Sequence, residues 1–278
     1  MKSVAFTANP GRMGFRELYR VAGGPTVGFI ACGLKLFRIL GPQRDGYGMR
    51  TLGDRLVRRD IDDLPEHVLE ATENYRDKLE RLGFIPCFAY SLESYGMQEG
   101  HAIPHRHKSG VAAANVLYTR CVRNDNETLA TTFAFNTPLS DGTYIVTSGL
   151  KRMMCKPSHF LVKNMPGRSP NDVFERHIER LEKANALPQT IKTDDELAQL
   201  VLNCENEDTE FNFERGVYVK MTRDDIELGK ELQEEYQDEM SDRPRRRRRY
   251  EDDEDEEEDD YEDEDREYED DDRPRRRR

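Results

Sequence analysis

The chain of 278 residues has no tryptophan and only five cysteines, none of which forms a C-x-x-C pair. A zinc ribbon or a thiol redox motif needs such close pairs, because two thiolates must converge on one metal or on each other. We therefore expect reduced thiols without disulfides, which is typical of a cytoplasmic protein. The cysteines are Cys32, Cys87, Cys121, Cys155 and Cys204.

The chain also lacks a long apolar run, and residues 1–15 have no continuous apolar core, so they do not resemble a signal peptide. The longest apolar segment, 27–40, contains Lys35 and Arg38 and falls short of the ~20 residues that a spanning helix needs. Two interpretations stay open: the segment packs on the core, or it lies on a membrane surface. As a helix it aligns one apolar side, formed by Phe29, Ile30, Leu34, Phe37 and Leu40.

Motifs for nucleotide binding and serine hydrolysis are missing as well. The glycine-rich segment 23–28 is not followed by the Lys-[Ser/Thr] pair that grips phosphate and magnesium in a P-loop. No G-x-S-x-G nucleophile elbow occurs. The sequence therefore predicts no catalytic residue and no cofactor.

Charge divides the chain into two parts. Residues 1–240 hold 31 basic and 36 acidic residues, whereas residues 241–278 hold 12 arginines and 20 acidic residues. The second part has no apolar periodicity and cannot bury enough surface to offset chain entropy, so we expect a disordered tail. Its arginine blocks flank an acidic block, so we expect a polyampholyte whose positive and negative charges screen each other within the same segment. The alternative is salt-dependent contact with nucleic acid or anionic lipid.

The first strong helix signal covers 64–82, with Asp63 as its cap and Gly83 after its end. Residues 1–61 show few strand signals. The helix carries an apolar stripe at 3–4 spacing, made of Val68, Ala71, Tyr75, Leu79 and Leu82.

Alternating apolar residues then predict strands in series. In the third of them the large Leu129, Phe133 and Phe135 alternate with small residues such as Ala130 and Ala134. No helix separates these segments, which favours an antiparallel meander. The predicted strands are 84–92, 111–122, 128–136, 143–148 and 158–163.

Two further helices begin at Ser169-Pro170 and at the capping box Thr193-x-x-Glu196. The segment 216–221 alternates like one more strand, and Thr222 begins a last, sparsely apolar helix that we expect to be exposed. The fold prediction is α+β, an antiparallel sheet of five or six strands with helices packed on one face. The expected parts are an N-terminal segment, 1–61, a globular domain, 62–222, the exposed helix, 223–240, and the tail, 241–278.

The best candidate for chemistry is a histidine-rich segment, which Pro104 and the flanking glycines predict to be a loop. His105 and His107 at i and i+2 would share one face if extended, so both imidazoles could reach one metal ion. The acidic ligand expected shortly after them is missing. The nearest further ligands by residue type are His159, His177, Glu93 and Glu99.

Two functional hypotheses follow. The first is a non-enzymatic binding or scaffolding protein for an unidentified protein or small molecule, because no catalytic constellation is complete. Its additional contacts would be a membrane surface through 27–40 and nucleic acid or anionic lipid through the tail. The second is a metal-binding protein or metal-dependent enzyme that uses His105 and His107. The expected location is cytoplasmic, with partial membrane association if 27–40 is interfacial.

Overall fold

The structure is a computed structural model, and its compact unit covers Met1–Ser241. The predicted tail beyond Asp242 and Phe37 of the apolar segment lie outside the described residues. The structure describes residues 3–21, 25–36, 40–96, 98–123, 126–150 and 155–242. Within them the chain mixes helices and strands, as expected for an α+β protein.

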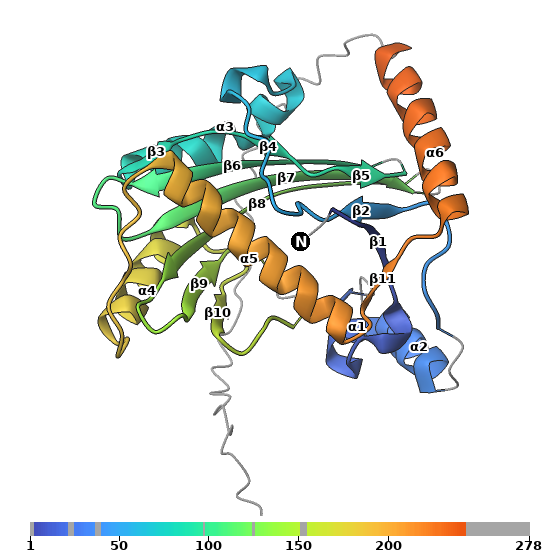
Figure 1. Ribbon diagram of the computed structural model, residues 1–278, viewed down its shortest axis with the longest axis horizontal. Helices are drawn as coiled ribbons and strands as arrows, with labels where there is room; N and C mark the ends of the chain where they lie inside the picture. Colours follow the sequence, from blue (N-terminus) through green and yellow to red (C-terminus); the bar gives the residue numbers. More distant parts are fainter. Residues whose placement is uncertain are drawn as a thin grey trace, which may run out of the picture. The chain divides into compact units, whose positions relative to one another are not determined.

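Seven strands of the described chain form the larger sheet, in the order β10-β9-β8-β7-β6-β3, with β4 also paired to β6 (Figure 1). The two longest strands, β7 and β8, lie in the middle and pair along the whole length of β7. The strands are β3 (Phe84–Pro86), β4 (Tyr90–Ser91), β6 (Gln98–His107), β7 (Ala113–Arg123), β8 (Asn126–Pro138), β9 (Tyr144–Ser148) and β10 (Phe160–Asn164).

The strand order corrects the predicted meander at its last strand. β10 runs parallel to β9, with Phe160 opposite Tyr144. A parallel neighbour requires the chain to return to the end where the previous strand began, and residues 149–159 are long enough to do this. The series is antiparallel only from β3 to β9.

The histidine-rich segment is not a loop but strand β6, next to the centre of the sheet. Pro104 lies opposite the gap between β3 and β4, where its carbonyl accepts a hydrogen bond from Cys87 N (3.0 Å). The nitrogen of a strand residue points to the same side as its carbonyl, so the missing N–H of Pro104 falls where the neighbouring strand is interrupted. Proline thus marks an interruption of the neighbour and not the end of this strand.

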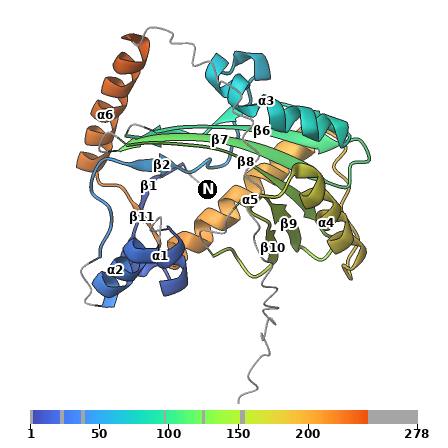
Figure 2. The same cartoon turned by 180° about the vertical axis from the view of Figure 1, so that it is seen from behind.

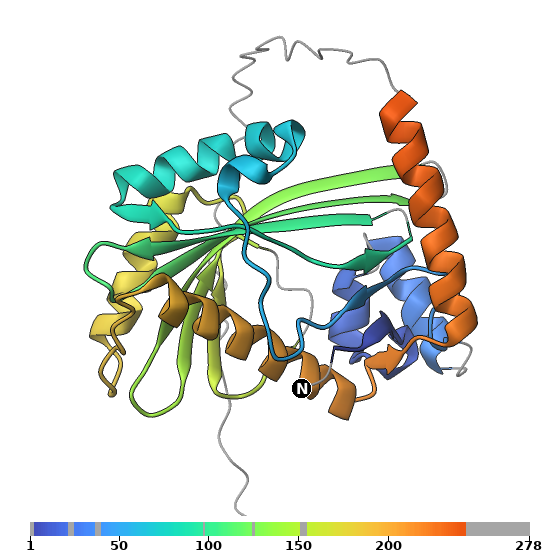
Figure 3. The same cartoon turned by 45° about the horizontal axis from the view of Figure 1, so that its top comes forward.

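Helices cover both faces of the larger sheet, not one as predicted. Helices α3 (Glu66–Arg81) and α4 (Pro170–Glu182) pack on the face that carries Phe135. Helix α5 (Asp194–Glu214) packs through Leu197 and Leu200 on the opposite face. Figure 3 shows α3 above the sheet and α5 beneath it, and Figure 2 shows α4 from behind. Successive side chains of a strand point to opposite faces of the sheet, so the central strands contribute residues to the core on each face.

The capping residues predicted from the sequence can be compared with the observed first residues of the helices. Ser169 and Asp172 form a capping box at α4, and Thr193 and Glu196 form one at α5, which confirms both predictions. Helix α3 has no side-chain cap, because Asp63 lies in the 3-10 turn η2 (Ile61–Asp63) and Pro65 occupies the cap position.

A smaller sheet joins the two ends of the compact unit. It has the order β11-β1-β2-β5, formed by β1 (Ala5–Ala8), β2 (Gly48–Arg50), β5 (Ser94–Tyr95) and β11 (Tyr218–Lys220). Few strand signals were expected in 1–61. Strands of three or four residues are too short to show a period, and their pairing with β11 and β5 is not local in sequence.

Three more helices surround this sheet: α1 (Phe15–Val21), α2 (Pro25–Leu36) and α6 (Arg223–Asp242), with the 3-10 turn η1 (Pro10–Arg12) before α1. Helix α6 was expected to be exposed, but Asp225 and Tyr236 are buried. Gly229 allows α6 to lie directly against Gly46, because a Cβ there would meet the Gly46 carbonyl. No helix in the described part of the chain is long and apolar enough to cross a membrane.

Candidate binding cavity

A cavity of about 280 Å³ lies between α5 and strands β7 to β10. Near its first turns α5 packs closely on the sheet, where Leu197 and Leu200 join the core around Tyr90. Further along, the facing wall on β8 is made of small side chains, among them Thr132 and Ala134. These small residues leave a space between β8 and helix α5. On the other face of β8 the large side chains of Phe133 and Phe135 leave no such space, because they pack into the core.

Two asparagine side chains give this cavity unused hydrogen-bond acceptors. Asn136 Nδ2 donates to Cys204 Sγ (3.2 Å), and Asn115 Nδ2 donates to Tyr90 Oη (3.5 Å). The amide Oδ1 atoms of Asn115 and Asn136 are buried and have no partner among the described residues. An unsatisfied buried acceptor costs about 1–3 kcal/mol, so two at one cavity wall call for an explanation.

Glu205 brings a carboxyl group to the same cavity. It lines the open space and keeps accessible surface, but the surrounding protein removes bulk water and raises its pKa. Lys156, also in the lining, opposes this rise, and Asp208 adds to it. The Lys156 ammonium is paired with Asp208 (Nζ–Oδ2, 2.7 Å), which leaves Glu205 without an ion pair of its own in the described part of the chain.

The Cys204 thiol faces the cavity as a protonated group. Burial raises its pKa to about 12, an effect that the Asn136 hydrogen bond only partly opposes. The thiolate is the nucleophilic form of cysteine, so this residue is a poor nucleophile at neutral pH. Cys204 therefore contributes shape and a weak hydrogen-bonding group to the cavity, not covalent chemistry.

A second polar cluster lies on the opposite face of the sheet, beside the start of α3. Ser91 Oγ is 3.0 Å from His101 Nδ1, and His101 Nε2 is 2.8 Å from Glu99 Oε1. Glu99 also bonds His67 Nε2 (3.0 Å). Burial alone would raise the pKa of Glu99, but its two histidine partners hold it at about 2. Hydroxyl, imidazole and carboxylate thus lie at the distances required of a nucleophile, a base and an orienting group.

The predicted metal ligands are engaged in other contacts. His105 is fully buried, and its Nδ1 bonds the carbonyl of Ile103 (2.8 Å). His107 Nδ1 lies 2.7 Å from Ser109 Oγ, and its Nε2 lies 3.1 Å from the carbonyl of Leu82. In the residues that the structure describes, no three His, Cys, Asp or Glu side chains are grouped to hold a metal ion. Metal binding at His105 and His107 stays a prediction without a third ligand.

The other ligands considered from sequence lie apart from these two. His159 Nε2 bonds Glu207 Oε2 (2.6 Å) near the cavity, and Tyr144 Oη donates to Glu207 Oε1 (3.3 Å). His177 is buried between Thr137 and Thr147, which bond its two ring nitrogens. Glu93 pairs with Arg50 (3.1 Å).

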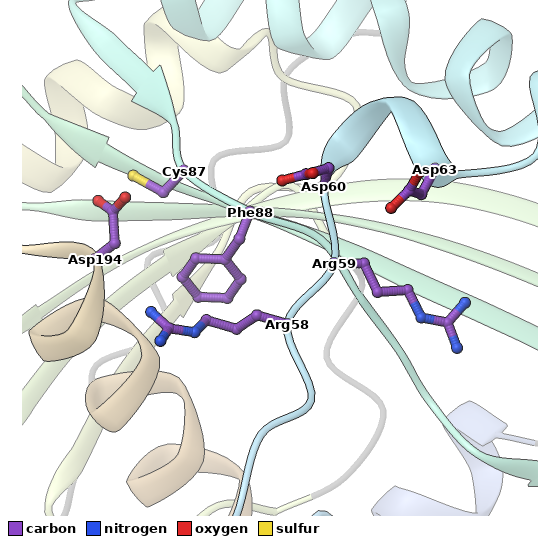
Figure 4. A pocket seen from close by; sticks show the side chains of 7 residues that line it. All are labelled: Arg58, Arg59, Asp60, Asp63, Cys87, Phe88 and Asp194. Carbon is purple, nitrogen blue, oxygen red and sulfur yellow. The ribbon is translucent and has the colours of Figure 1, made fainter.

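A surface hollow of about 430 Å³ lies at the start of α5, beside Cys87 and Asp194 (Figure 4). Arg58 lies over the Phe88 ring (5.8 Å) and pairs with Asp195 (2.7 Å), while Arg59 points away from it. Burial, and next Asp194, raise the pKa of Cys87 to about 11, so the thiol stays protonated. Charges of both signs line the hollow, which therefore lacks the single-sign field that attracts an ionic ligand.

Comparisons with protein-family models, with curated proteins and with solved structures give no match to this chain.

Proposed function

We propose that this chain binds a small, largely apolar molecule that carries a hydroxyl or amino group, inside the cavity beneath α5. The two unpartnered amide oxygens of Asn115 and Asn136, in the wall of a largely apolar cavity, support this proposal. The proposal agrees with the class of binding proteins expected from the sequence, and it adds the chemical class of the ligand. The scaffolding role, the contacts of the tail and the cytoplasmic location stay predictions.

The size of the cavity limits the ligand. A buried apolar cavity of ~150 Å³ holds a benzene molecule, and sites for drug-sized ligands begin near ~300 Å³. About 280 Å³ therefore suits a ring or short chain with a few substituents. Its apolar part would rest against Leu117, Val146 and Leu200, which line the space.

The polar groups of the lining select the ligand's polar end. A hydroxyl or an amine can donate to the Oδ1 atoms of Asn115 and Asn136, whereas a carboxylate can only accept. Glu205 adds a third acceptor when ionised and would repel an anion. We expect affinity in the order amine or alcohol, then plain hydrocarbon, then carboxylate, for ligands of one size.

Thermal unfolding with matched ligands tests this order. Benzylamine and benzyl alcohol should raise the melting temperature, toluene should raise it less, and benzoate should leave it unchanged. A ligand at ten times its dissociation constant stabilises by about 1.4 kcal/mol. Ala134→Leu, which fills the cavity, should abolish the shift, whereas Glu210→Gln on the exposed side of α5 should preserve it. Equal shifts in wild type and Ala134→Leu would reject the proposal.

A second candidate function is acyl transfer at Ser91, favoured by the distances in the cluster. His101 would accept the Ser91 proton as the hydroxyl attacks an ester carbonyl, and Glu99 would orient the imidazole. The attack forms an acyl-serine and releases the alcohol, and water then frees the acid.

A fluorophosphonate probe tests the second candidate on the full chain. Labelling at Ser91 that is lost in Ser91→Ala and reduced in His101→Gln would support it. The exposed Ser169 hydroxyl, already bonded to Asp172, serves as an internal control for non-specific labelling. Absence of label at Ser91 excludes the candidate, because the probe needs only an activated serine.

A further inference from the structure

Helix α2 turns its small side chains toward the protein and its large apolar ones toward solvent. At 100° per residue, Gly28, Ala31, Cys32 and Lys35 occupy one arc of the helix. Ala31 and Cys32 pack on the core around Met13 and Val217, and Gly28 is buried against Tyr19. The sequence left open whether this segment packs on the core or faces outward. In the structure the small side chains of α2 pack on the core.

The outward half of α2 is apolar at every described position. Val27, Ile30 and Leu34 line one side of it, and Phe29 and Leu36 line the other, with Gly33 between. Phe29 is 72% exposed, Leu36 is 70% exposed and Ile30 is 58% exposed. Isolated exposed apolar residues are ordinary, but a continuous apolar half-helix marks a surface that binds something.

Helix α1 extends this apolar surface. Tyr19 contacts Phe29 edge to face (5.5 Å between ring centroids), and the Lys35 ammonium lies over the Phe15 ring (5.5 Å). Phe15 and Tyr19 are themselves partly exposed. Gly28 permits this close pairing of the helices, because a Cβ there would lie 2.6 Å from the Tyr19 ring. The two helices therefore form one surface, here called the α1–α2 surface.

The segment that forms the α1–α2 surface is basic. Residues 1–44 contain seven Lys or Arg and one Glu, a net charge of +6 in a chain whose net charge is −13. The single acid, Glu17, is 5% exposed and paired inward with Arg215. Arg12 and Arg16 are exposed next to the apolar side chains. Residues 1–44 thus combine an apolar face with exposed basic side chains of their own, Arg12 and Arg16.

We propose that the α1–α2 surface docks on an anionic membrane, with the outward side chains of α2 inserted at the level of the headgroups. Amphipathic helices bind such interfaces through apolar burial and basic attraction together. Two copies of the chain would bring their basic segments face to face and repel each other. The acidic tail matches the charge, but it lacks apolar residues other than tyrosine to cover the helix.

Vesicle flotation of the full chain tests this inference. The protein should float with vesicles of phosphatidylcholine and phosphatidylglycerol, float poorly with phosphatidylcholine alone, and be released by salt. Phe29→Asp should lower the partition coefficient about tenfold or more, since it removes one inserted aromatic ring. Leu187→Asp is the matched control, because Leu187 is 77% exposed elsewhere on the protein and should not affect binding.

The melting temperature of Phe29→Asp should stay at the wild-type value, since the side chain makes little contact with the core. Equal flotation of wild type and Phe29→Asp would overturn the proposal. Sedimentation without lipid provides the other contrary result: a concentration-dependent dimer that Phe29→Asp dissolves would assign the surface to a second copy of the chain.

Discussion

The Glu17 carboxylate is paired with the Arg215 guanidinium, 198 positions away in sequence. It also accepts from the backbone N–H groups of Gly14 (2.8 Å) and Cys155 (2.6 Å). One buried side chain thus joins α1, the residue after α5 and the segment that leads to Lys156 at the cavity. Burial alone would raise the pKa of Glu17, but these donors hold it at about 2.

Glu17→Gln should therefore destabilise the protein at neutral pH. The variant leaves Arg215 without its partner, and the pKa difference between about 2 folded and 4.5 unfolded corresponds to about 3 kcal/mol. A lowered carboxyl pKa stabilises above pH 4.5, and this stabilisation is lost as pH falls toward 2. Urea unfolding of both proteins should differ most at pH 7 and converge near pH 2.

Glu70→Gln provides the control, because Glu70 is exposed on α3. It should follow the wild-type curve at every pH. A Glu17→Gln curve that runs parallel to wild type down to pH 2 would mean that this carboxylate is not held ionised by the fold.

Helices with local start signals could be predicted from the sequence. Thr193 and Glu196 bond each other's backbone N–H groups within one turn, so the signal and the structure occupy the same four residues. The turn at Asp141-Gly142 is just as local: an Asp-Gly pair is typical of a tight hairpin, and Gly142 adopts a positive φ of 83° between the paired strands β8 and β9. Features that depend on neighbours in sequence need no knowledge of the rest of the fold.

Features that depend on distant neighbours could not be predicted. Pro104 suggested a loop, but its tolerance in β6 depends on where β3 and β4 separate. The sequence pattern at the cavity is the alternation of Phe133 and Phe135 with the smaller Thr132 and Ala134. Small residues indicate a hollow only once a long helix, α5, is known to cross that face.

Metal binding at His105 and His107 can be tested directly. Both rings already bond protein groups, and no third ligand is grouped with them in the described residues. We expect purified protein to contain no stoichiometric zinc, iron or manganese, and His105→Ala/His107→Ala to match wild type in metal content. Stoichiometric metal that this double variant loses would restore the metal hypothesis.

Removal of the tail should leave the folded unit intact. Truncation after Asp242 retains all of α6, including the buried Tyr236. With no apolar periodicity in residues 243–278, we expect a change in melting temperature of less than about 2 °C. Binding of single-stranded RNA, if the full chain shows it, should weaken on truncation and in salt. A drop of several degrees would show that the tail docks on the folded unit.

His105 should make the stability of the protein depend on pH well above the range of Glu17. Burial, opposed by the Ile103 carbonyl and assisted by the charge of Arg76, lowers the pKa of His105 to about 4. Below its unfolded value of about 6.5, the unfolded chain binds a proton that the folded protein does not, so stability falls as pH falls. At pH 5 this costs about 2 kcal/mol relative to pH 7.

Replacement of His105 by leucine should remove that dependence. The imidazole Nε2 is buried and has no partner among the described residues, so leucine of similar size loses only the bond from Nδ1 to the Ile103 carbonyl. Urea unfolding between pH 7 and 5 should show a shallower slope for His105→Leu, by about one proton. His107→Gln, on the same face of β6 and less buried, serves as the matched control. An unchanged slope in His105→Leu would mean that His105 takes up its proton in the folded protein.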